Sequence, residues 1–119
     1  MKLIKKLFLL FIINFLLFSC GGKVEKSWVI EDFSNGKMFN VEAKDNKIYS
    51  SAIVYIEGKV NNKLCFRRNQ NDTTECRKFS KDTSFIRSRY DFYGGNFSYQ
   101  LLPSKAKGKI KVTIELPYH

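Results

Sequence analysis

The chain has 119 residues, a formal net charge of +10 and 44% hydrophobic side chains. This length provides one domain and excludes a two-domain architecture. The single histidine, His119, is the last residue, so a Ser-His-Asp or Cys-His arrangement would depend on a frayed terminus. We therefore expect a protein that is not an enzyme.

The first nineteen residues differ in kind from the rest. Three lysines (Lys2, Lys5 and Lys6) precede the apolar run "LFLLFIINFLLFS". A basic start followed by an apolar stretch of this length predicts a secretory signal peptide over residues 1–19. A membrane-spanning helix is the alternative, but it needs about twenty apolar residues. Removing residues 1–19 takes away three lysines and no acidic residue, which leaves a mature charge of +7.

The signal segment ends in "LFSC", and this ending resembles the bacterial lipobox. An aliphatic residue, Leu17, stands three positions before Cys20, and the small residue Ser19 directly precedes it. The resemblance implies that the Cys20 sulfur receives diacylglycerol, that cleavage occurs before Cys20, and that the new amino group is acylated. An ordinary signal peptide with a chance cysteine is the alternative. Gly21 is not the aspartate that retains enterobacterial lipoproteins at the inner membrane, so we expect an outer-membrane anchor that faces the periplasm.

Residues 20–27, "CGGKVEKS", are predicted to form a short lipidated tether, because two glycines precede solvated charges. Residues 28–119 are then predicted to form the folded domain. Within it, "SWVIEDF" and "MFNVEA" have the composition of strands, and the intervening "SNGK" predicts a hairpin turn.

Two longer strands follow. The segment "NKIYSSAIVYIEG", residues 46–58, carries apolar side chains on both faces, which predicts a central strand. The segment "GKIKVTIELP", residues 108–117, alternates strictly and predicts a half-buried strand that ends at Pro117. Turn signals recur every eight to twelve residues. Together these patterns predict an all-β fold, a small antiparallel β-sandwich of the immunoglobulin-like kind with seven to eight strands.

Cys65 and Cys76 lie on either side of the polar segment "NQNDTT". If "KLCFRR" and "ECRKFS" pair as a hairpin, the two thiols face each other, and an oxidising compartment favours a disulfide. This assignment also accounts for the odd cysteine count, because Cys20 is used by the lipid. A redox-active pair or a metal site is the alternative, but the spacing is not CxxC and no histidine is near. No metal and no cofactor are expected.

A basic cluster surrounds this hairpin. Its members are Arg67, Arg68, Arg77, Lys78, Lys81, Arg87 and Arg89. If the hairpins are neighbours, these side chains form one cationic patch beside aromatic rings, which suits an envelope protein or an anionic envelope component. A solvated strand face is the alternative. Nucleic acid is not expected as a partner of an exported lipoprotein.

The motif "DFYGG" follows this cluster. Asp91 can start a turn, and Gly94 and Gly95 allow positive φ before the next strand. These residues predict a corner turn in which Phe92 and Tyr93 plug the end of the sandwich. An aromatic recognition loop at Tyr93 is the alternative.

The overall pattern resembles small β-rich lipoproteins of Bacteroidetes-type bacteria, to which no activity is assigned. The matching residues are Ser19, Cys20 and Gly21 at the start, Asp91, Tyr93, Gly94 and Gly95 in the turn, and Pro103, Ala106, Gly108, Ile110 and Val112 in the last strand. The resemblance covers the two ends of the chain better than its middle.

Two functional hypotheses follow. The first is a non-enzymatic binding module, anchored to the bilayer through acylated Cys20, with an inhibitor or immunity factor as one form. The second is a structural accessory subunit of an envelope complex, in which an edge strand pairs with a partner. A small hydrolase ranks last, and Asp91 is its only candidate carboxylate.

Overall fold

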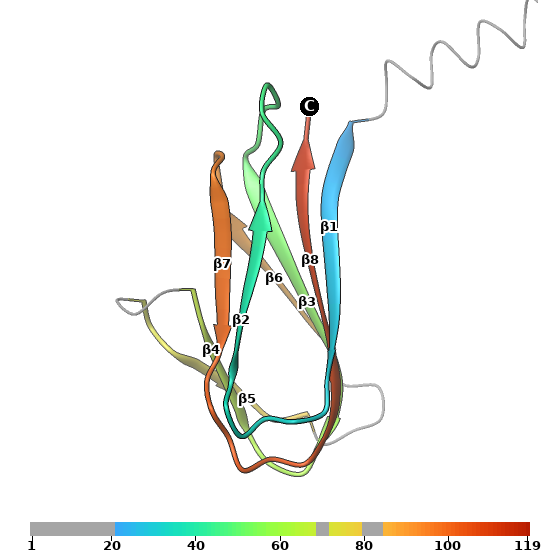
Figure 1. Cartoon of the computed structure of the whole chain (residues 1–119), viewed down its shortest axis with the longest axis vertical. Coiled ribbons are helices and arrows are strands. Elements are labelled where there is room, and N and C mark those ends of the chain that lie inside the picture. Colours follow the sequence, from blue (N-terminus) through green and yellow to red (C-terminus); the bar gives the residue numbers. More distant parts are fainter. Residues whose placement is uncertain (1–20, 69–71, 80–84) are drawn as a thin grey trace, which may run out of the picture.

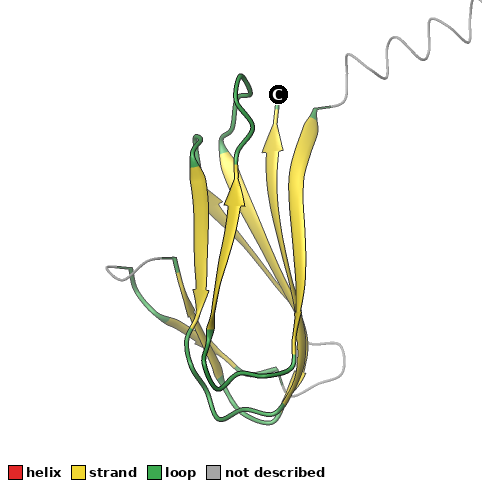
Figure 2. Cartoon of the chain, in the orientation of Figure 1, coloured by secondary structure: helices red, strands yellow, loops and turns green. Residues whose placement is uncertain are grey.

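A computed structural model describes residues 21–68, 72–79 and 85–119, and these residues form eight antiparallel strands with no helix among them (Figures 1 and 2). The strands make two four-stranded sheets. This arrangement confirms the predicted small antiparallel β-sandwich. Within the same residues, no helix is long and apolar enough to cross a bilayer. The signal segment 1–19, Cys20 and Lys81 lie outside the described residues.

The first sheet has the strand order β1-β8-β3-β6 and the second β2-β7-β4-β5. The first sheet contains β1 (Gly22–Ile30), β8 (Gly108–Tyr118), β3 (Ser51–Val60) and β6 (Phe85–Asp91). The second contains β2 (Lys37–Glu42), β7 (Asn96–Leu101), β4 (Leu64–Arg67) and β5 (Glu75–Arg77).

Period-two alternation builds the core. In β8, Ile110, Val112, Ile114 and Leu116 are buried, as the sequence predicts. The strand nevertheless continues past Pro117 to Tyr118, which pairs with Gly22 of β1. The predicted central position of the strand within residues 46–58 is also confirmed, because β3 lies between β8 and β6, but the strand begins only at Ser51 and continues past Gly58 to Val60. Among the described residues, no polar or charged residue is buried.

The expected tether is instead a strand. Residues 22–27 belong to β1, which pairs with β8 from Gly22 opposite Tyr118 to Ile30 opposite Ile110. The two glycines that suggested flexibility have a packing reason. A Cβ on Gly21 would lie 2.6 Å from the Tyr118 carbonyl oxygen, and one on Gly22 would collide with the Tyr118 ring. A side chain at position 21 would strike backbone, whereas one at position 22 would require the Tyr118 ring to turn away, so close packing favours glycine where the sequence suggested a loose linker.

The "SNGK" turn joins the two sheets, so the prediction of a hairpin was wrong. β1 pairs with β8, whereas β2 pairs with β7. The carbonyl of Phe33 accepts hydrogen bonds from the amides of Gly36 (3.4 Å) and Ser104 (2.8 Å). The Phe33 side chain is buried at the end of the core. Gly36 has a φ of 66°, so the Asn-Gly signal located a reversal correctly but could not say which sheet received the next strand.

The "DFYGG" segment is the corner at which the chain leaves β6 for β7 in the other sheet. Phe92 is buried and packs edge-on against Tyr49 and Phe97, with ring centroids 5.6 and 5.8 Å apart. Gly95 adopts a φ of 82°, as a corner turn requires. Tyr93, which was expected to help plug the end, is instead 77% exposed.

β3 and β8 approach each other unusually closely near one end of the sheet. Gly58 pairs with Ile110, and Gly108 pairs with Val60. Both glycines have a positive φ, 143° and 142° respectively. A Cβ on Gly58 would collide with the Lys109 carbonyl oxygen and lie 2.8 Å from the Ile110 Cα, and both of these are backbone atoms that cannot rotate away.

Gly58→Ala is therefore expected to destabilise the domain by about 2 kcal/mol or more, through backbone strain and overpacking. Denaturant unfolding followed by Trp28 fluorescence measures the change in the free energy of unfolding. Lys63→Ala, at an exposed position beside the same end, is the matched control and should stay within about 0.5 kcal/mol of the parent. Equal stability of Gly58→Ala and the parent would contradict this account of the close approach.

Candidate functional site: the open flank

The two long sides of the sandwich differ. On the side of β1 and β2, the rings of Trp28 and Phe39 lie 4.9 Å apart and close the gap between the sheets. On the other side, the β4–β5 hairpin leans away from the body of the sandwich (Figure 1). β6 pairs with β3 over seven residues, Ser51–Glu57, yet none of its own residues is buried. We call this side, formed by β6, β4, β5 and Arg68, the open flank.

The hairpin at the open flank is held by a disulfide. Cys65 and Cys76 are directly opposite in the β4–β5 register and are bonded to each other, with their Cα atoms 4.0 Å apart. The predicted pairing is confirmed. The short Cα separation is typical of a non-hydrogen-bonded antiparallel pair, and the Cys65 carbonyl accepts from the Leu102 amide instead. The bond therefore fixes a three-residue strand, β5, that pairs with β4 alone.

Aromatic rings form the floor of the open flank. Phe66 stacks on Tyr99 with centroids 5.7 Å apart and an interplanar angle of 19°. Tyr90 of β6 lies 5.9 Å from Phe97 and 5.7 Å from Tyr99. The Tyr90 hydroxyl donates to the Tyr99 hydroxyl at 3.3 Å and so joins the two sheets across the flank. The flank is thus apolar inside but carries hydroxyl groups.

Arg68 enters this aromatic setting directly after β4. Its guanidinium carbon lies 4.8 Å from the Phe97 centroid and 5.7 Å from the Tyr90 centroid, within cation–π range. Its Nη1 donates to the Asp91 carbonyl at 3.5 Å, which is a long bond. Its Nε is buried and has no hydrogen-bond partner among residues 21–68, 72–79 and 85–119. An unpaired buried donor costs about 1–3 kcal/mol, so a carbonyl or carboxylate that reached Nε would be stabilised.

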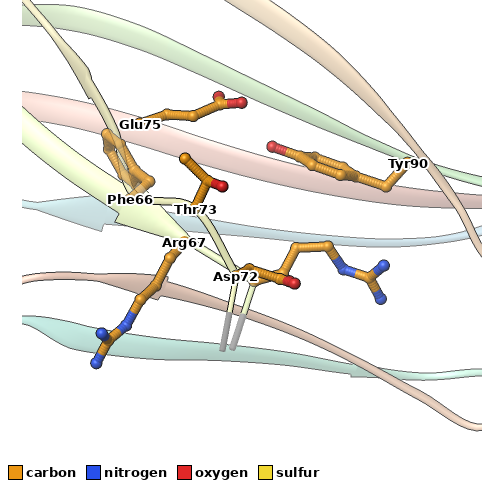
Figure 3. Close-up of a pocket in the computed structure, with 7 residues that line it drawn as sticks. Phe66, Arg67, Asp72, Thr73, Glu75 and Tyr90 are labelled. Carbon is orange, nitrogen blue, oxygen red and sulfur yellow. The ribbon is translucent and has the colours of Figure 1, made fainter. Parts of the chain in front are cut away.

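Acceptor groups surround a hollow of about 310 Å³ at this position. Figure 3 shows the Glu75 carboxylate and the hydroxyls of Thr73 and Tyr90 turned toward one shared space, while the Arg67 guanidinium points away from it. Asp72 and Thr73 line the same hollow and are exposed. Arg68 and these acceptors therefore line one hollow, with the unpaired Nε buried behind its surface.

The structure divides the basic cluster predicted from the sequence. Arg67 lies on the outer face of the second sheet, where its Nε donates to Gln100 at 2.9 Å. Arg87 and Arg89 lie on the outer face of the first sheet, and the Arg87 guanidinium lies 5.8 Å from the Tyr55 centroid. Arg77 and Lys78 are exposed on and beside β5. A single cationic patch would require these residues on one face, and the two-sheet topology separates them.

Sequence reasoning missed the acceptors Asp72, Thr73 and Glu75, and it grouped Arg68 with outward-facing arginines. One pattern in the sequence could have distinguished Arg68 from the outward-facing arginines. Alternate residues of a strand share a face, and Arg68 follows Leu64 and Phe66 in this alternation. Both of these residues are buried on the inner face of β4. An arginine at an inward position of a strand predicts a polar group at the edge of a core.

The turn residues form the corner between β6 and β7. Asp91 is exposed, and its backbone carbonyl, not its carboxylate, receives the Arg68 bond. No set of three or more histidine, cysteine, aspartate or glutamate side chains is arranged to hold a metal ion anywhere in residues 21–68, 72–79 and 85–119.

Tyr99 of β7, in the aromatic floor beneath the open flank, is a strongly perturbed titratable group. Burial, and secondly the hydrogen bond with Tyr90, raise the pKa of the Tyr99 phenol far above its usual range. The hydroxyl thus stays protonated over the whole physiological range and serves as a fixed hydrogen-bonding group.

Comparisons with known proteins add little. No protein-family model matches the chain, and no curated protein matches it. Among solved structures, PirA is similar at 14% identity with a TM-score of 0.44, over 80% of this chain and 93% of PirA. A structure of Bacillus endospore appendages, a family of disulfide-linked pili, is similar at 12% identity with a TM-score of 0.31, over 84% and 92% of the two chains. Both values are below the level at which a shared activity follows.

The raised pKa of Tyr99 predicts a loss of stability in alkali. Above the usual tyrosine pKa of about 10, the unfolded chain releases the Tyr99 proton while the folded chain retains it. The free energy of unfolding should then fall by up to about 1.4 kcal/mol per pH unit. Below pH 10 this contribution is fully present. Unfolding curves between pH 9 and 11 measure the slope.

Tyr99→Phe should flatten this slope, whereas Tyr93→Phe, at an exposed ring, should leave the parent slope nearly unchanged. A parent slope that Tyr99→Phe does not reduce would contradict the assignment of the alkaline sensitivity to Tyr99.

Proposed function

We propose that this protein is a bacterial lipoprotein, anchored in the cell envelope through acylated Cys20, that acts as a non-enzymatic binding module. Its membrane is the outer membrane, and the domain faces the periplasm. The open flank receives an extended segment of a partner protein, and an inhibitor or immunity factor is one form that such a module takes. The module binds this segment as an extended peptide and needs no cofactor.

The observation that carries this proposal is the buried Nε of Arg68, which has no partner among the described residues, beside the edge strand β6, whose inner-face residues are only half-buried. An added strand can satisfy the free backbone groups of an edge strand, and pockets for alternate side chains then give specificity. A carbonyl or carboxylate of such a segment would accept from Arg68, and its amides would donate to the acceptors around Glu75. The aromatic floor would cover its apolar side chains.

A structural accessory subunit is the alternative function. The same free edge of β6 favours it, because permanent pairing inside a larger envelope complex would cover the inner face equally well. The two functions differ in how stably the protein is bound to its partner. An accessory subunit would migrate in mild detergent as part of a stable complex, whereas a binding module would migrate alone and capture its partner reversibly.

The anchor is tested by the intact mass of the protein extracted from membranes, measured with and without reductant. We expect a chain that begins at Cys20, carries added lipid mass, and gains two hydrogens on reduction of the Cys65–Cys76 bond. A Cys20→Ala variant should lack the lipid mass. An unlipidated parent chain would remove the membrane-anchored part of the proposal.

The binding site is tested by a photo-cross-linking residue at Ser88, which is half-buried on the inner face of β6. We expect one discrete protein adduct in the native envelope. Arg68→Gln should weaken the binding of this partner by roughly ten- to hundredfold, since a hydrogen bond to a charged group contributes about 1.5–3 kcal/mol. Affinity of the purified partner for each variant is the measurement.

Arg67→Gln is the matched control, because it removes a neighbouring arginine whose guanidinium lies on the outer face. It should retain the adduct and the affinity. A second cross-linker position at Lys111, which is exposed on the outer face of β8, reports non-specific capture. Equal adducts from Ser88 and Lys111, or equal losses in the two arginine variants, would contradict the open flank as the binding site.

A further inference from the structure

The start of β1 limits how far the domain can stand from a membrane. β1 begins at Gly22, and its backbone is paired with β8 from that residue onward. Only Gly21 separates Cys20 from this strand. Two extended residues span about 7 Å, and the headgroup region is about 5–7 Å thick on each side of a bilayer. An acylated Cys20 therefore holds the end of the sandwich within the headgroups.

The same end of the sandwich contains several other segments. Tyr118 forms a bridge with Tyr49, and Ile48 and His119 exchange backbone hydrogen bonds of 3.0 and 3.3 Å. The Ala43 amide donates to the Gly95 carbonyl and so joins the β2–β3 connection to the "DFYGG" corner. We call this end, formed by Gly21, residues 43–50, residues 92–95 and residues 118–119, the anchor end. Figure 1 shows the C-terminus beside the start of β1.

The anchor end carries the two most exposed large hydrophobic side chains among the described residues. Tyr93 is 77% exposed and Ile48 is 72% exposed, whereas Val29, Phe85 and Met38 elsewhere range from 57% to 49%. Neither has a structural task, since Phe92 and Tyr49 already fill the core at this end. An exposed tyrosine and an exposed aliphatic residue next to a lipid anchor suit the membrane interface.

Two lysines of the anchor end lie over the Tyr118 ring. The Nζ atoms of Lys44 and Lys47 lie 5.6 and 5.1 Å from the Tyr118 ring centroid. Their long apolar stems with charged tips allow contact with both headgroups and acyl chains. Glu42 and Asp45 lie close to these lysines, and Asp91 ends β6 next to residues 92–95, so three carboxylates offset the two lysines and this end has no positive excess. The interaction that the anchor end supports is therefore interfacial and apolar, and does not depend on anionic lipid.

The opposite end of the sandwich is different. It carries the exposed lysines Lys37, Lys63, Lys105, Lys107 and Lys109, and its loops hold no comparably exposed apolar side chain in the described part of the chain. Such an end would be drawn to an anionic surface only through charge. Apolar contact with the bilayer therefore favours the anchor end, whereas attraction to an anionic surface would favour the lysine-rich end.

We propose that the anchor end is itself a lipid-binding surface, in which Tyr93 and Ile48 insert at the headgroup boundary and hold the sandwich upright. This inference rests on the proposed lipid anchor at Cys20. The open flank then runs along the bilayer normal and stays accessible from the periplasm, and the lysine-rich end points away from the membrane.

The test uses the full lipidated chain in phosphatidylcholine vesicles, with a nitroxide label on one cysteine introduced at a time. Tyr93→Cys and Ile48→Cys probe the anchor end, and Lys105→Cys is the control at the opposite end. Collision rates with oxygen and with a water-soluble nickel complex are measured for each. We expect an oxygen-to-nickel ratio several-fold higher at positions 93 and 48 than at 105, with little change when anionic phosphatidylglycerol or salt is added.

The outcomes separate the two proposals. A sample whose intact mass lacks the lipid overturns the anchor and, with it, this orientation. A lipidated sample in which positions 93 and 48 are as accessible to nickel as position 105 overturns the lipid-binding surface alone. Protection of position 105 in anionic vesicles would also overturn it, and would assign membrane contact to the lysine-rich end.

Discussion

The antiparallel pairing of β1 with β8 is the constraint on which the rest of the structure depends. It brings Gly22 and Tyr118 together, so the start of the folded domain and the end of β8 occupy the same end of the sandwich. It also gives β8 a partner on each side, which buries the alternate residues of the strand completely. Because β1 takes one edge of the first sheet, β6 is left as the other edge.

The open flank follows from that placement. β6 faces the short, disulfide-stapled β4–β5 hairpin, which cannot cover it in the way that β2 covers β1 through Phe39 and Trp28. The side chains that remain at this flank are aromatic rings with hydroxyl groups and one arginine with an unused donor. A sandwich whose two flanks were both closed by ring contacts would have no such site. The proposed binding at the open flank rests on this difference between the two flanks.

Much of the fold could be predicted from the sequence, because local patterns decide it. The alternation of β8, the central character of β3 and the pairing of Cys65 with Cys76 all depend on residue type and spacing. Residue type and spacing do not determine which sheet a strand joins after a turn. The "SNGK" reversal looks like a hairpin turn locally, and only the tertiary pairing of β2 with β7 shows that it crosses between sheets. The tether was misjudged for a similar reason, since close packing against Tyr118 and flexibility both call for glycine.

The candidate site was less predictable. Arg67 and Arg68 are neighbours in the chain and have the same chemistry, yet one binds Gln100 outside and the other lies over Phe97 inside. Strand parity distinguishes them, but only once the strand boundaries are known. The acceptors that join Arg68 come from β5 and from the loop before it, and the pairing that places them is set by the β4–β5 register.

The strand order also has a consequence for folding. β8 is paired with β1 and β3 in the first sheet, yet it follows every other strand in the chain. The first sheet therefore cannot assemble while the chain is still being synthesised, and β1, β3 and β6 have no complete sheet to join until residues 108–118 are available. Contacts between segments this distant in sequence form slowly. The first sheet of such a chain is completed later than a sheet built from consecutive hairpins.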